Sequence, residues 1–120
     1  MTNLKTIALI AEEELAKHLS STSNGTQYIA GFRTKRGREL ALERNRDSIF
    51  VWVECIDSGL PGITIRNVKK PGMTYSKDQG RNSNLNATNA PRLKRGKPAF
   101  YLEVAAVEDL KELIRWYQAA

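Results

Sequence analysis

The chain of 120 residues contains very little cysteine or histidine, with one residue of each, Cys55 and His18. One cysteine cannot form an internal disulfide, and this pair cannot build a zinc site from Cys and His ligands alone. The phosphate-loop pattern Gly-x-x-x-x-Gly-Lys-Ser/Thr and the dinucleotide pattern Gly-x-Gly-x-x-Gly are also missing. We therefore expect no metal, no cofactor and no catalytic residue, and the chain is not predicted to be an enzyme.

Long hydrophobic runs are absent as well. The longest apolar run covers residues 7–11 and is followed by three glutamates, so we expect no membrane-spanning segment. The same region lacks the basic start and the cleavage site of a secretory signal. Together with the absence of disulfides, these features predict a cytoplasmic protein.

Length and composition predict one domain over residues 1–120. Two domains of about 60 residues would each bury too little surface to be more than marginally stable. The hydrophobic fraction is 41% and the charged fraction 27%, which is typical of globular proteins. Lys and Arg outnumber Asp and Glu by 19 to 13, for a net charge of +6, so a negatively charged partner is expected.

Hydrophobic periodicity predicts the order of the elements. Apolar residues at helical spacing predict helices over residues 3–20 and 107–118. Runs with β-branched or aromatic residues, or with alternation, predict strands over 26–34, 39–44, 48–54, 63–68 and 98–104. The first three strands are separated by gaps short enough for hairpins.

This pattern predicts an α+β fold with an antiparallel sheet of four to five strands. Both helices are expected to pack on one face of the sheet, and a long basic loop is expected over residues 69–96. The predicted core residues are Leu4, Ile7, Ala11, Leu15, Leu40, Leu42, Ile49, Val51, Val53, Phe100, Leu102, Val104, Leu110 and Ile114.

Positive charge is concentrated in two segments, residues 33–46 and residues 66–97. The second holds nine Lys or Arg against Asp78 alone, so its net charge of +8 exceeds that of the whole chain. Such asymmetry is typical of a phosphate-binding surface, although charged loops are also often simply solvated. The loop is rich in asparagine, which can hydrogen-bond adenine or can merely favour turns.

Aromatic residues give a second, weaker indication of a binding surface. In the strand over 48–54, alternation places Phe50 and Trp52 on the face opposite Ile49 and Val51, and Tyr101 lies on the corresponding face of its own strand. These rings could stack on bases. Alternatively, both faces of this strand are buried, with the second face under the loop over residues 69–96.

Acidic residues on the strands raise the possibility of a metal-dependent nuclease. Glu43 and Glu54 could approach each other across neighbouring strands, and Glu39 is a further candidate. The ordinary explanation is pairing with the nearby arginines Arg38, Arg44 and Arg46. No strand glutamate has a lysine two positions later, which is the Glu-x-Lys pattern that would favour a nuclease. We therefore favour the structural explanation.

We therefore predict a nucleic-acid-binding module, with DNA favoured over RNA, that could be the recognition domain of a larger restriction or modification protein. The alternative is a protein-interaction or inhibitor domain, for example a phage-borne anti-defence protein, that docks on an acidic surface. The predicted contact residues are Arg33, Lys35, Arg36, Arg38, Trp52, Lys69, Lys70, Arg81, Asn82, Asn84, Arg92, Lys94, Arg95, Lys97 and Tyr101.

Overall fold

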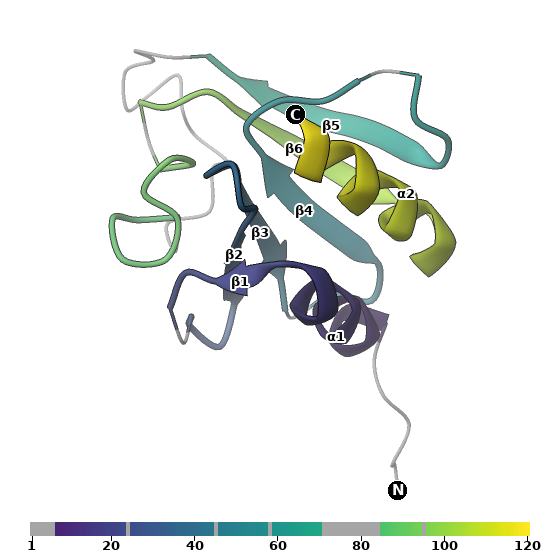
Figure 1. Ribbon diagram of the computed structural model, residues 1–120, viewed down its shortest axis with the longest axis horizontal. Coiled ribbons are helices and arrows are strands. Elements are labelled where there is room, and N and C mark those ends of the chain that lie inside the picture. Colours follow the sequence, from purple (N-terminus) through teal and green to yellow (C-terminus); the bar gives the residue numbers. More distant parts are fainter. Residues whose placement is uncertain (1–6, 24, 45, 58, 71–84, 95) are drawn as a thin grey trace, which may run out of the picture.

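Six antiparallel strands form one sheet in the order β1-β2-β3-β4-β6-β5 (Figure 1). The computed structural model describes residues 7–23, 25–44, 46–57, 59–70, 85–94 and 96–120, and the statements below concern those residues. The elements are α1 (Ile7–His18), β1 (Ser20–Ser21), β2 (Ile29–Arg33), β3 (Glu39–Glu43), β4 (Ile49–Val53), β5 (Ile63–Lys69), β6 (Ala99–Val104) and α2 (Val107–Ala119).

The α+β prediction with an antiparallel sheet is confirmed, but the strand number is corrected to six. The additional strand is β1, whose two serines pair with Arg33 and Phe32 at the end of β2. Neither serine has strand propensity, so this strand depends on its partner rather than on its own residues. The first helix ends at His18, two residues before the predicted end. Most of the predicted basic loop lies outside the described residues.

Alternation along the strands separates the two faces of the sheet. Leu40 and Leu42 of β3 and Val51 of β4 face the helices, and they pack with Leu15 of α1 and Leu110 of α2 in one core. Of the predicted core residues, Ile7 and Phe100 are half-buried against this core, Leu4 lies outside the described residues, and the others belong to it. Figure 1 shows both helices on the same side of the sheet.

The opposite face, called the open face below because neither described helix covers it, carries a second and smaller core. Ile29, Ala41 and Trp52 belong to the strands, and residues Leu85 and Leu93 come from the segment before β6. This segment, residues 85–94, is drawn in green beside β2 and β3 in Figure 1. It therefore closes part of the open face, as expected if both faces of β4 are buried.

Candidate functional site

The hairpin between β2 and β3 presents predicted contact residues to solvent. Its turn closes with hydrogen bonds from the Thr34 amide to the Arg38 carbonyl (2.8 Å) and from the Gly37 amide to the Thr34 carbonyl (3.0 Å). Gly37 has a φ of +92°, which glycine adopts without a steric penalty. Lys35 and Arg36 are exposed at the tip, and Arg36 Nη1 donates a hydrogen bond to the Ala119 carbonyl at the end of α2 (2.9 Å).

The segment of residues 85–94 is fixed to the sheet edge through Asn89. The Thr22 hydroxyl donates a hydrogen bond to the Asn89 carbonyl (2.5 Å), and the Ser23 hydroxyl donates to the Asn89 side-chain oxygen (2.7 Å). The neighbouring strand residue is Gly31, where an added Cβ would lie 2.2 Å from the Asn89 carbonyl oxygen. The segment can approach β2 this closely only because Gly31 has no side chain.

A buried carboxylate, Glu54, joins the hairpin to this segment. Glu54 follows β4 and is 8% exposed. Its Oε2 accepts hydrogen bonds from the Glu39 amide (2.6 Å) and from Arg92 Nε (2.8 Å). Its Oε1 accepts from Arg92 Nη2 (2.8 Å) and Arg38 Nη1 (3.3 Å). The bidentate pair with Glu54 raises the pKa of the Arg92 guanidinium, so the arginine stays charged.

A second buried carboxylate, Glu39, lies next to Glu54 on the open face and is fully buried. It accepts hydrogen bonds from Arg33 Nη2 (2.6 Å) and from the Arg92 amide (2.8 Å). From the helix side, the Tyr117 hydroxyl donates to the Glu39 carbonyl (2.5 Å) and accepts from the Glu54 amide (2.8 Å). Burial raises the pKa of Tyr117, so this hydroxyl remains a donor.

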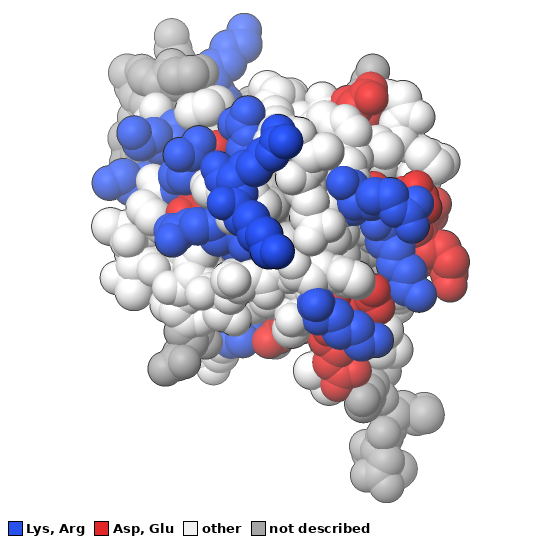
Figure 2. Space-filling view, viewed as in Figure 1, with Lys and Arg blue, Asp and Glu red and all other residues white. Residues whose placement is uncertain are grey.

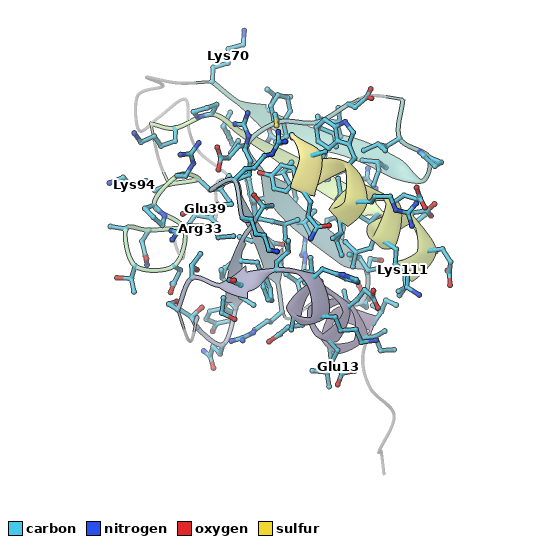
Figure 3. All side chains as sticks on the ribbon, in the orientation of Figure 1. Glu13, Arg33, Glu39, Lys70, Lys94 and Lys111 are labelled. Atoms are coloured by element: carbon cyan, nitrogen blue, oxygen red, sulfur yellow. The ribbon has the colours of Figure 1, made fainter. Side chains whose placement is uncertain are left out.

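The arginines of this network remain accessible, unlike the carboxylates. The side chains of Arg33, Arg38 and Arg92 are 44%, 36% and 54% exposed. Figure 3 shows Arg33 beside Glu39, with Lys94 on the same side of the molecule. The arrangement therefore consists of acids on the inside and guanidinium groups on the outside.

Most of the exposed cations near the network lie on one side of the molecule. Figure 2 shows Lys and Arg gathered at the left, over the hairpin and the segment before β6, with little acidic surface between them. Elsewhere in this view the two signs are mixed. We call this the basic surface, and its described members are Arg33, Lys35, Arg36, Arg38, Arg92, Lys94 and Lys97.

The predicted aromatic residues form a stack farther along the open face. Trp52 packs on Tyr101 (ring centroids 4.5 Å apart), Tyr101 packs on Phe50 (5.4 Å), and the Arg46 guanidinium lies 4.5 Å from the centre of the Phe50 ring. Glu43 accepts hydrogen bonds from Trp52 Nε1 (3.1 Å) and from the Tyr101 hydroxyl (2.5 Å). Burial, with this bond to Glu43, raises the pKa of Tyr101 to about 12.

This stack changes the interpretation of two predicted contact residues. Trp52 is 1% exposed, so a base cannot reach its ring without opening the second core. Tyr101 is half-buried, and its ring already stacks on two rings of the protein. Trp52 therefore fits the alternative in which both faces of β4 are buried. The rings of Trp52 and Tyr101 are not included in the basic surface.

Of the remaining predicted contact residues, two are described by the structure and four lie outside the described residues. Lys69, at the end of β5, is 4% exposed, whereas Lys70 is exposed and extends away from the sheet in Figure 3. The positions Arg81, Asn82, Asn84 and Arg95 lie outside the described residues.

The acidic residues considered for a nuclease are instead partners of arginines. Arg38 pairs with Glu54 and Arg46 with Glu43, as the structural explanation predicts, whereas Arg44 pairs with Glu12 on α1 (2.8 Å). No group of three His, Cys, Asp or Glu side chains placed to hold a metal occurs in the described part of the chain. The roles of Glu39 and Glu54 as hydrogen-bond centres were not predicted, although strand alternation places Glu39 opposite the leucines of β3.

Two further features lie away from the basic surface. A cleft of about 320 Å³ between α1 and α2 is lined by residues that include Glu14, His18 and Lys111. Cys55, after β4, is half-buried, and burial raises the pKa of its thiol. Neither described helix combines the length and the apolar character needed to cross a bilayer.

Comparison with known proteins gives no match. No protein-family model, no curated protein and no solved structure is significantly similar to this chain.

Proposed function

We propose that this protein binds nucleic acid through the basic surface, with DNA favoured over RNA. The observation that carries the proposal is that cations from two segments far apart in sequence, the hairpin and the segment before β6, lie together on one side of the fold. Phosphate groups are the negative charges that such a surface most commonly recognises, and arginine binds them with directed hydrogen bonds.

The form of the surface supports a polymeric ligand rather than a small anion. Most of its members are exposed, and they lie on the hairpin and on the turns before β6; none of them lines the cleft between α1 and α2. A nucleic acid has regularly spaced phosphates and can contact several such cations at once, and each neutralised phosphate adds to the affinity through counterion release.

The proposal is tested by removing two cations from the basic surface and two from elsewhere. The Lys35→Ala/Arg36→Ala double variant removes one Lys and one Arg at the hairpin tip, and Lys111→Ala/Arg115→Ala removes the same pair from α2. Both sites are exposed. We expect the hairpin variant to bind labelled DNA more weakly. The slope of log K against log[salt] should become shallower by about 2, while the α2 variant binds like the wild type.

The opposite results contradict the proposal. Equal weakening by both double variants would mean that overall charge, rather than this surface, attracts DNA. If no variant and no wild-type protein binds nucleic acid, the surface is better explained as a docking site for an acidic protein.

A further inference from the structure

We infer that Glu39 and Glu54 are positioning residues, which hold Arg33, Arg38 and Arg92 in a fixed arrangement for contact with phosphates. The inference rests on the proposed function, and it assigns a role to the buried acids that charge alone does not explain. It also predicts that removing an acid from a basic surface weakens the binding of an anion.

The first observation is the burial of two acids under the basic surface. Glu39 is fully buried and Glu54 is 8% exposed. Burying a carboxylate is unfavourable unless it is paired and fully hydrogen-bonded. Both acids meet this condition through the arginines and two backbone amides, at distances of 2.6 to 3.3 Å.

The second observation is that each arginine uses only part of its guanidinium group. Arg92 uses Nε and Nη2, Arg38 uses Nη1, and Arg33 uses Nη2. Within the described residues the other N–H groups have no hydrogen-bond partner, and all three side chains are more than one third exposed. These N–H groups are therefore available for a ligand while the opposite edges are held.

The third observation concerns the effect of the two acids on the net charge of the network. Two carboxylates offset two of the three positive charges in the network, which reduces the attraction of an anion. Their compensating effect is geometric, because a bidentate carboxylate fixes the plane of Arg92, and a side chain that is already ordered loses less freedom on binding. Glu54 also links Arg38 to Arg92, and Glu39 accepts from Arg33 and from the Arg92 amide, so the three arginines are held relative to one another.

Two variants separate geometry from charge. Arg92→Lys keeps the positive charge but cannot make the bidentate pair, and Glu54→Gln makes the surface more positive while weakening its hold on Arg92 and Arg38. An explanation from charge alone predicts unchanged binding for the first variant and tighter binding for the second. The positioning role predicts weaker binding for both, by about 2- to 10-fold.

The matched controls come from the exposed pair on α2. Arg115 donates to Glu112 at 2.8 Å, with the side chains 75% and 48% exposed. Arg115→Lys and Glu112→Gln therefore make the same chemical changes without affecting the network. All proteins are titrated into a fluorescein-labelled DNA probe at one salt concentration, and circular dichroism is used to check that each is folded.

The outcomes separate this inference from the proposed function. Loss of affinity in R92K and E54Q, with R115K and E112Q unchanged, is the expected result. If wild type binds the probe but R92K binds equally well, or folded E54Q binds more tightly, the positioning role is overturned while nucleic-acid binding stands. If E54Q fails to fold, E39Q, which weakens the hold on Arg33 in the same way, takes its place beside R92K. If wild type binds no probe, the proposed function fails first.

Discussion

At the scale of single residues, Trp52 lies at the centre of the second core. Its ring packs on Tyr101, and its indole N–H donates to Glu43 at 3.1 Å. A buried indole needs such a partner, and Glu43 is held in turn by Tyr101 and Arg46. The side chain is therefore part of the structure that supports the open face rather than part of its surface.

Replacing Trp52 tests this assignment. We expect Trp52→Ala to lower the free energy of unfolding by about 3–5 kcal/mol, because it leaves a large cavity between Ala41 and the segment of residues 85–94. Trp52→Phe keeps an aromatic ring and should lose less. Urea denaturation followed by circular dichroism measures both, and a loss below about 1 kcal/mol for the alanine variant would contradict the buried role.

Glu14 provides a pH-dependent prediction. Burial alone would raise the pKa of its carboxyl, but the hydrogen bond from His18 and the charges of Lys17 and Lys111 outweigh burial and lower the pKa below its ordinary 4.5. A carboxyl with a lowered folded-state pKa stabilises the fold above its unfolded-state pKa. This contribution is lost as the pH falls through the folded-state value.

We therefore expect the stability advantage of wild type over Glu14→Gln to be constant down to about pH 5 and to shrink below about pH 4.5. Thermal denaturation at several pH values measures the difference. An advantage that stays unchanged between about pH 6 and pH 3 would show that the Glu14 carboxyl has the same pKa in the folded and unfolded states.

At the scale of elements, the segment of residues 85–94 depends on a close approach to β2. Asn89 accepts hydrogen bonds from Thr22 and Ser23, and Leu93 fills the second core. We expect Gly31→Ala to displace this segment, since the new Cβ would lie 2.2 Å from the Asn89 carbonyl oxygen. The free energy of unfolding should fall by about 1–3 kcal/mol.

Hydrogen exchange provides the specific measurement. In Gly31→Ala the amides of Ala90 and Leu93, which donate to carbonyls within the segment, should exchange faster than in wild type. Gly59→Ala is the control, because its new Cβ would come no closer than 3.4 Å to the atoms around it. Unchanged protection of both amides in Gly31→Ala would show that the segment does not depend on this contact.

The elements also show how far the sequence predicts this fold. Period-two alternation in β4 predicted that Ile49 and Val51 face one way and Phe50 and Trp52 the other, because successive strand residues point to opposite faces. The pairing of Ser20 and Ser21 with β2 was missed, because it comes from a tertiary partner and leaves no periodic signal. The same applies to Leu93, whose burial depends on contacts distant in sequence.

For the candidate site, charge predicted the basic residues but not their support. The concentration of positive charge in two segments predicted Arg33, Arg38 and Arg92 as contact residues. Their shared attachment to Glu39 and Glu54 could not be predicted, since it requires β3, β4 and the segment before β6 to meet at one point. Such a network is visible only once the sheet order is known.

At the scale of the whole molecule, the main feature is that the basic surface lies apart from the regions of mixed charge on the face shown in Figure 2. Lys111 and Glu13 lie on the other side from Arg33 and Lys94 in Figure 3, and acidic and basic side chains alternate there in Figure 2. We expect a molecule with its charge arranged in this way to orient a polyanion toward one side.

The most direct test of nucleic-acid binding is fluorescence anisotropy of the wild-type protein with labelled single-stranded DNA, duplex DNA and RNA at several salt concentrations. We predict binding to DNA with a log–log salt slope of about −4 to −5 on duplex, which corresponds to about five neutralised phosphates. Absence of binding to all three probes at low salt would contradict the account.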